Sequence, residues 1–428
     1  MKKYYFKNFH LLDGTKEMKD TLVSYMEITN DTITGIGDMN IDNNCEIIDL
    51  NGAYVMPGLI NLHVHLPATG KISKKKLGDK SKLAKFITSN ALLKKIGIAI
   101  CKKSAILELK SGVTTIRTVG GLSDIDGIIR DNINKGKYLG PRIFTSNEAI
   151  ATPKGHMVGT VSQAVSSIDE GIKLIHKLKE QNVDLIKLMI TGGVLDSEEV
   201  GHPGVLKMPA EYVKALCDEA HKLGLQVAAH IESPEGLQVG ALNGVDTIEH
   251  GAAISDETIN TMKENNTKFI CTLSPALPFV YIDPEIIGYG EVAQINSKVL
   301  LDGMVAGLKK ALANNIEVGL GNDTGCPYVT HYGFYRELGY FTKFIGVDPT
   351  FAIYSSTLQA AKILNIDSYT GSVEINKKAD LLIVKNNPLE TFNNLKNPYY
   401  VVKEGKFIKE PKIKRYKNVE EALDNLYK

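Results

Sequence analysis

Cysteine, net charge and long apolar runs are all scarce in this chain of 428 residues. The five cysteines are widely spaced and form no Cys-x-x-Cys pair, so we expect reduced thiols rather than a disulfide framework. No apolar run approaches the roughly 20 residues that a membrane-spanning helix needs. The first residues include lysines, but no apolar segment follows them as it would in a signal peptide. These features predict a cytoplasmic protein.

The overall charge balance excludes a second group of functions. The 50 basic and 49 acidic side chains leave a formal net charge of +1, so no global field attracts nucleic acid or an anionic membrane. Hydrophobic residues make up 43% of the chain and charged residues 23%, which is typical of a globular protein and excludes a disordered one. We expect a small-molecule substrate, no nucleic-acid or membrane partner, and a homo-oligomer.

Several common catalytic motifs are also missing. The chain contains no Gly-x-Ser-x-Gly elbow, no His-Glu-x-x-His pair and no Gly-rich phosphate loop ending in Gly-Lys-Ser/Thr. Gly319-Leu320-Gly321 lacks the further spacing of a dinucleotide fingerprint. The chemistry must therefore lie in other residues.

From about Pro57 onward, short apolar runs alternate with helical patterns. Eight runs have the length of strands: 58–65, 113–119, 142–146, 184–190, 226–230, 246–250, 268–273 and 316–321. Helix-like stretches include 81–110, 168–181, 209–223, 296–314 and 349–364. Strands separated by helices imply a parallel sheet, and eight is the strand count of a closed barrel. We predict an α/β protein with a (β/α)8 TIM barrel.

Both ends of the chain have β character instead. The candidate strands are 4–6, 21–28 and 32–36 at one end, and 371–373, 379–384 and 398–402 at the other. Two β regions that flank one barrel suggest a single small domain. We predict a composite β-sandwich domain with a C-terminal tail from residues 1–55 and 366–428, and a metal-dependent catalytic barrel from residues 56–365.

The strongest chemical signal is a histidine pair at the end of the first barrel strand. His63 and His65 are two residues apart on a strand, so their side chains point the same way and can hold one metal ion. Lys187 is the second signal, because it interrupts the apolar run 184–190. A buried lysine becomes a neutral amine that can take up carbon dioxide, and the carbamate offers one oxygen to each of two metal ions.

Three further residues lie at or just past strand ends. His230 ends the fifth predicted strand, His250 ends the sixth, and Asp323 follows the eighth. Barrel enzymes place their catalytic groups at this face, so the side chains of five strands would meet at one barrel mouth.

With these residues in place, the sequence resembles the metal-dependent amidohydrolase superfamily, and most of all its imidazolonepropionase-related branch with Xaa-Pro dipeptidases and zinc-dependent carboxypeptidases. The resemblance runs from 55–65 to 377–384 and includes 112–117, 140–144, 186–193 and 248–251. It implies two divalent metal ions, taken as zinc. The implied ligands are His63 and His65 on one ion, His230 and His250 on the other, carbamylated Lys187 as the bridge, and Asp323 as ligand and proton shuttle.

Two positions depart from the pattern of these relatives, and three more are candidates for substrate contact. Thr118 stands where many relatives have aspartate, and Glu232 where close relatives often have a second histidine. His156 resembles a substrate-contacting histidine of relatives, and His331 lies in the loop after the eighth strand. Arg117 is one of only five arginines and could hold a substrate carboxylate.

The sequence therefore predicts a metal-dependent amidohydrolase that cleaves a C–N bond of a dipeptide or N-acyl amino acid with a hydroxide shared by two metals. One alternative is a mononuclear deaminase or cyclic-amide hydrolase of the imidazolonepropionase type, although one-metal members do not need a bridging lysine. The other is a non-catalytic binding protein on the same barrel. Such a protein would be expected to lose ligands, whereas this chain keeps all six.

Overall fold

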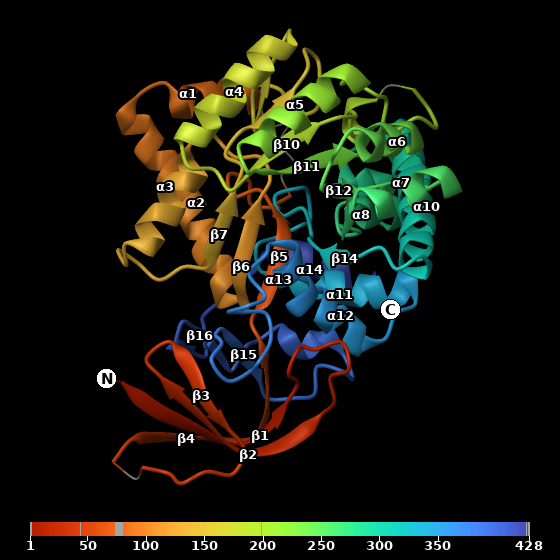
Figure 1. Cartoon of the computed structure of the whole chain (residues 1–428). Helices are drawn as coiled ribbons and strands as arrows, with labels where there is room; N and C mark the ends of the chain where they lie inside the picture. The colour runs from red at the N-terminus through yellow and green to blue at the C-terminus, as the bar shows by residue number, and fades with distance from the viewer. Residues whose placement is uncertain (1, 43, 73–79, 198, 425, 427–428) are drawn as a thin grey trace.

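The computed structural model describes residues 2–426 except residues 43, 73–79, 198 and 425, and shows a barrel with a β-sheet at one end (Figure 1). The barrel strands are β5 (Leu59–Val64), β6 (Val113–Thr118), β7 (Arg142–Thr145), β8 (Ala149–Ala151), β10 (Leu185–Met189), β11 (Gln226–Ile231), β12 (Thr247–His250), β13 (Lys268–Cys271) and β14 (Val318–Leu320). Short β9 (Ser162–Ala164) pairs with β8 outside this ring. All eight predicted runs contain a barrel strand, so the predicted fold class is confirmed.

The third position of the barrel is divided between two strands. β7 pairs with β6, whereas β8 pairs with β10, and residues 146–148 separate the two. The strands pair in parallel throughout, and a parallel bridge between Val64 and Thr324 joins the two ends of the ring. β10 is buried along its whole length, as expected for a strand with neighbours on both faces.

Gly321 permits the close approach of β5 to the segment after β14. A Cβ atom added at Gly321 would lie 2.5 Å from the Cβ of His63, so only glycine fits there without a shift. The backbone N–H of Asp323 then donates to the carbonyl of His63 at 3.0 Å. The ends of the first and last barrel strands are thereby fixed side by side.

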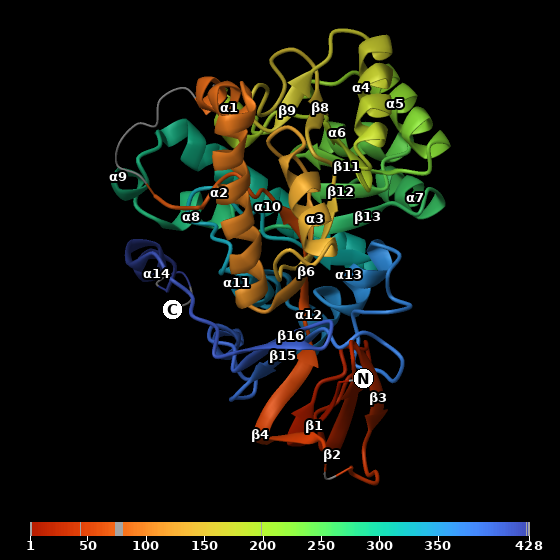
Figure 2. The same cartoon turned by 90° about the vertical axis from the view of Figure 1, so that its left-hand side faces the viewer.

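Helices surround the barrel in both views (Figures 1 and 2). They are α1 (Lys80–Thr88), α2 (Ala91–Lys110), α3 (Ile125–Asn134), α4 (Ile168–Glu180), α5 (Ala210–Lys222), α6 (Pro234–Leu242), α7 (Asp256–Glu264), α8 (Ala276–Tyr281), α9 (Pro284–Ile287), α10 (Glu291–Ala313), α11 (Phe334–Tyr340), α12 (Pro349–Ser355), α13 (Leu358–Ile363) and α14 (Lys417–Asp424). None of the helices in the described part of the chain is both long and apolar enough to cross a bilayer.

Two predicted helices are each divided in the structure. The stretch 81–110 forms α1 and α2 because Asn90 caps the second helix, its side chain accepting from the N–H groups of Leu92 and Leu93. The stretch 349–364 likewise forms α12 and α13. Helical periodicity continues across both breaks, so the sequence pattern alone did not reveal them.

The chain ends build one sheet of seven strands. Its order is β17 (Lys406–Lys409), β16 (Tyr400–Lys403), β15 (Leu381–Val384), β4 (Glu46–Pro57), β1 (Lys3–Leu11), β2 (Thr21–Thr29) and β3 (Thr32–Ile36), and every pair except β1–β4 is antiparallel. β15 pairs with β4, so the C-terminal strands extend the N-terminal ones, as predicted. Residues 371–373 form no strand, which corrects that prediction. The exact division at 55/56 and 365/366 stays a prediction.

The sheet lies at the end of the barrel where the strands begin (Figure 1). β4 ends at Pro57 and β5 begins at Leu59, so the chain passes directly from the sheet into the barrel. Arg142, at the start of β7, forms ion pairs with Asp380 at 2.8 Å and Glu404 at 2.9 Å. The opposite face, where the strands end, is left for the predicted site.

Candidate metal centre

The predicted metal ligands converge at the carboxyl ends of the barrel strands. The ring of His63 lies 4.7 Å from that of His250 and 5.2 Å from that of His65, centroid to centroid. His230 lies 4.7 Å from His250 on the other side. All four imidazoles thus form one continuous cluster, contributed by β5, β11, β12 and His65 directly after β5.

Asp323 completes one side of this cluster. Its Oδ1 lies 3.1 Å from Nε2 of His65 and 3.5 Å from Nε2 of His63. Burial alone would raise the pKa of this carboxyl, but the hydrogen bond from His65 and the neighbouring histidines hold it well below its usual range. His250 and Asp323 have φ angles of 67° and 55°, in the left-handed region that is uncommon for residues other than glycine but that histidine and aspartate adopt more readily than most.

A shell of hydrogen bonds orients the imidazoles. Nδ1 of His63 lies 2.8 Å from a carboxylate oxygen of Glu249, and Nδ1 of His65 lies 2.8 Å from the carbonyl oxygen of Gly120. Nδ1 of His250 bonds with the hydroxyl of Thr272 at 2.7 Å. Burial lowers the pKa of His63 to about 4 and those of His230 and His250 well below the usual value. The neutral rings of His63 and His250, whose Nδ1 atoms are engaged, therefore present Nε2 to a metal ion, whereas Nε2 of His230 lies 3.2 Å from the carbonyl oxygen of Gly192.

Glu249 connects this shell to Arg117. One oxygen of Glu249 faces His63, and the other accepts from Nη2 of Arg117 and from the hydroxyl of Thr247, both at 2.7 Å. Nε of Arg117 also donates to the carbonyl of Leu62 at 2.7 Å, and this arginine is only 2% exposed. These contacts favour a positioning role for Arg117 over the predicted substrate contact. Glu249 was not predicted from the sequence, although its place directly before His250 in a short predicted strand could have indicated it.

We expect Glu249→Gln to weaken metal binding by about 10- to 100-fold, the range for partners that orient metal-bound histidines. Glutamine keeps the size of the side chain but removes the charge that complements both His63 and Arg117. Calorimetric titration of the metal-free variant with Zn²⁺ measures this change. Metal affinity equal to that of the wild type would contradict the orienting role.

Lys187 lies inside the barrel with its amine unpaired. Only 1% of the residue is exposed, which excludes a side chain that reaches solvent, and Nζ has no hydrogen-bond partner among the described residues. Burial lowers the pKa of Lys187 to about 8. A buried ammonium without a partner is costly, whereas a carbamate would turn this position into a two-oxygen ligand.

The donor set fits a metal centre. Two groups of side chains bring their ligand atoms within 4.8 Å of one another, namely His63, His250 and Asp323, and His230, Glu232 and His250. Imidazole nitrogens and carboxylate oxygens are the donors that zinc accepts in proteins. His65 belongs to neither group, although its Nε2 lies 3.1 Å from Asp323. Glu232, which was not predicted as a ligand, belongs to the second group.

The predicted substrate residues lie in different settings. His156 stacks on His230 at a centroid distance of 4.2 Å, hydrogen-bonds with Asp196 and keeps 21% of its side chain exposed. His331 is buried, and its two ring nitrogens lie 2.9 Å from a Glu108 carboxylate oxygen and 2.7 Å from the carbonyl oxygen of Ala68. His156 can therefore meet a ligand at the mouth, while the contacts of His331 favour a structural role. Thr118 is buried and donates to Thr145 at 2.8 Å.

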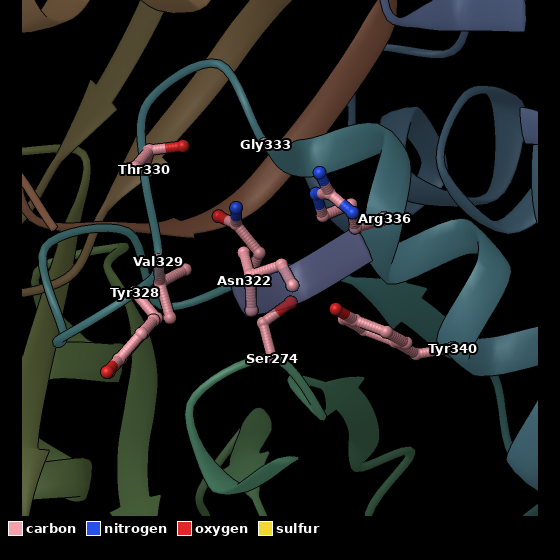
Figure 3. Close-up of a pocket in the computed structure, with 9 residues that line it drawn as sticks. Ser274, Asn322, Tyr328, Val329, Thr330, Gly333, Arg336 and Tyr340 are labelled. Atoms are coloured by element: carbon pink, nitrogen blue, oxygen red, sulfur yellow. The ribbon is translucent and has the colours of Figure 1, made fainter. Parts of the chain in front are cut away.

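A separate small cavity lies beside the loop after β14 (Figure 3). It has a volume of about 10 Å³, and its lining includes Ser274, Asn322 and Arg336. That volume admits about one water molecule. Asn322 also accepts from Asn61 at 2.8 Å, a bond that joins β5 to the segment after β14. The cavity is therefore lined by residues that hold the strand ends together, and none of the predicted metal ligands lines it.

Comparisons with known proteins agree with this geometry. The model of the amidohydrolase family matches residues 54–408. Ochratoxinase of Aspergillus niger is 23% identical over 392 residues, covering 84% of this chain and 76% of that protein. Imidazolonepropionase of Fusobacterium nucleatum is 26% identical over 406 residues, covering 87% and 88%.

Solved structures give the same result. A protein from Bifidobacterium longum, provisionally named a prolidase, is 32% identical with a TM-score of 0.86, covering 100% of this chain and 99% of its own. A Xaa-Pro dipeptidase with bound methionine is 28% identical with a TM-score of 0.81, covering 95% and 100%. The chain therefore belongs to the amidohydrolase family and is a hydrolase of carbon–nitrogen bonds.

Proposed function

We propose that this protein hydrolyses the amide bond of a dipeptide or N-acyl amino acid with two divalent metal ions, zinc in the first instance. The observation that carries the proposal is the buried, unpaired amine of Lys187, whose charge acts on the four clustered histidines and Asp323. His63 and His65 would hold one ion, His230 and His250 the other, and carbamylated Lys187 would bridge them. When bound, such ions lower the pKa of a water molecule and polarise the scissile carbonyl.

Asp323 supplies the proton transfer in this proposal. Its carboxylate faces His63 and His65 through Oδ1, and Oδ2 accepts from the thiol of Cys326 at 3.1 Å. An ionised carboxylate at this place can accept the proton of the attacking water and pass it to the leaving nitrogen. Glu249 and Arg117 act behind the histidines and keep the ring of His63 in place.

The substrate class is supported by the structural relative that is 28% identical and is a Xaa-Pro dipeptidase. A screen of dipeptides and N-acyl amino acids with the Zn²⁺- and Mn²⁺-loaded enzyme tests it. Release of a free amino acid from several members of either group is the expected result. Turnover of cyclic amides or amino-purines alone would favour the deaminase or cyclic-amide alternative, which the likeness to imidazolonepropionase keeps open.

We expect His156→Ala to raise KM for substrates with a free carboxylate about tenfold and to change kcat less. His156 stacks on His230 at the mouth and is partly exposed, so it can donate to a ligand without joining the metal cluster. Steady-state kinetics on an acid and its methyl ester measure the effect, and each tenfold change corresponds to about 1.4 kcal/mol of binding. His202→Ala is the matched control, since the side chain of His202 is 64% exposed. Equal losses on acid and ester would remove His156 from carboxylate recognition.

A further inference from the structure

Glu232 is held rigidly beside the second half of the histidine cluster. Its backbone N–H donates to the hydroxyl of Thr191 at 3.0 Å, and its Oε2 accepts from the backbone N–H of Val194 at 2.9 Å. Only 11% of the side chain is exposed. One carboxylate oxygen is therefore fixed by the loop after β10, which determines where the other oxygen points.

The other oxygen faces the imidazoles. Oε1 of Glu232 lies 3.9 Å from Nε2 of His230, and the ligand atoms of Glu232, His230 and His250 all lie within 4.8 Å of one another. Histidine and carboxylate ligands bind zinc at roughly 2.0 to 2.2 Å, so two ligands of one ion lie about 4 Å apart or less. The separation between Oε1 and His230 matches that span.

We infer that Glu232 is a further ligand of the ion held by His230 and His250. This inference rests on the proposed function, because it assumes a metal ion between those two histidines. The bond to Val194 gives Oε2 its partner, and metal ligation would give one to Oε1, which that bond directs at the imidazoles. Metal ligation would also explain why a carboxylate stands at position 232, where close relatives often have a second histidine.

An oxygen ligand at this position changes the metal preference of the site. Carboxylates suit Mn²⁺ better than imidazoles do, whereas both donors suit Zn²⁺. With Glu232 as a ligand, the second site therefore accepts both Zn²⁺ and Mn²⁺. The same site with histidine at position 232 would favour Zn²⁺. The comparison of glutamate with histidine at position 232 tests this directly.

The test is metal titration of the metal-free protein, followed by calorimetry and by elemental analysis. Glu232→Gln keeps the side-chain size, and its carbonyl oxygen can still accept from Val194, but it is a far weaker ligand. We expect it to lose affinity for one ion by about 100-fold or more, at the top of the range for partners that only orient ligands. Glu232→His should retain tight Zn²⁺ binding and lose most of its Mn²⁺ affinity. Glu235→Gln, on the exposed first turn of α6, is the matched control and should bind metal as the wild type does.

Cobalt substitution separates ligation from the loss of a nearby charge. If Glu232 is a ligand, the visible absorption of the Co²⁺ protein should change in Glu232→Gln. Wild-type affinity and an unchanged Co²⁺ spectrum in that variant would overturn the inference while leaving the dinuclear proposal intact. If the wild type itself binds only one ion, the dinuclear proposal fails, and the inference then depends on whether Glu232→Gln weakens that ion.

Discussion

Lys187→Ala should bind less than one metal ion per chain tightly and lose at least about 10³-fold in kcat/KM. The amine of Lys187 is buried and unpaired, and its carbamate would be the protein ligand shared by both ions. Loss of a metal centre removes several kcal/mol of transition-state stabilisation, and each 1.36 kcal/mol is a tenfold change in rate. Elemental analysis and steady-state kinetics measure the two effects.

Chemical rescue sharpens this test. Short carboxylic acids fit the space left by the lysine side chain in Lys187→Ala and should partly restore metal binding and activity. Lys187→Met is the matched control, because its side chain fills the same space and leaves no room for an added acid. Two tightly bound metals and full turnover in Lys187→Ala would show that the bridge assignment is wrong.

Asp323→Asn should keep much of its metal while kcat falls by roughly 10² to 10⁴, the span of a lost general acid–base group. Asparagine retains one oxygen for the ion but cannot carry a proton. The fall in kcat should be smaller for anilides with good leaving groups, because their nitrogen needs less protonation as it departs. Kinetics on a series of amides with different leaving groups, together with metal analysis, measure the effect.

A second carboxylate at the mouth provides the control for Asp323. Asp196 bonds with His156, so Asp196→Asn removes a charge from the same region without removing the proton shuttle. Any fall in kcat in Asp196→Asn should be the same for amides with good and with poor leaving groups. If Asp323→Asn binds two metals and hydrolyses a poor-leaving-group amide within a few-fold of the wild-type rate, Asp323 has no part in the proton transfer.

The barrel could be predicted because its strands are buried on both faces and appear as short apolar runs. β10 is such a run, interrupted only by Lys187, whereas three of the four residues of β12 are polar although the strand is fully buried. The break between α1 and α2 could not be predicted from periodicity, since it depends on the local cap at Asn90. Residues 371–373 have strand-like composition, but Gly371 adopts a φ of 93° and Val373 bonds to the carbonyl of Asp13 instead of a strand.

That the candidate ligand residues would meet at one face could be predicted from the sequence, whereas the residues that support them could not. Histidines at strand ends follow directly from the chain order, because parallel strands end at one face of the barrel. Their orientation depends on partners from other strands, such as Glu249 and Thr272, whose contacts exist only after folding. The partners of Arg117 and His331 could not be predicted either. Both side chains carry donors that a substrate could use, but in the fold they bond to Glu249 and Glu108.

The number of metal ions per chain at full activity tests the central claim most directly. Metal-free enzyme is titrated with Zn²⁺ while hydrolysis of the best dipeptide is followed and bound metal is measured. The proposed site predicts that activity rises until two ions are bound per chain, and that Lys187→Ala never reaches that plateau. Full activity with one ion per chain would contradict the two-metal, lysine-bridged centre and would favour the mononuclear alternative.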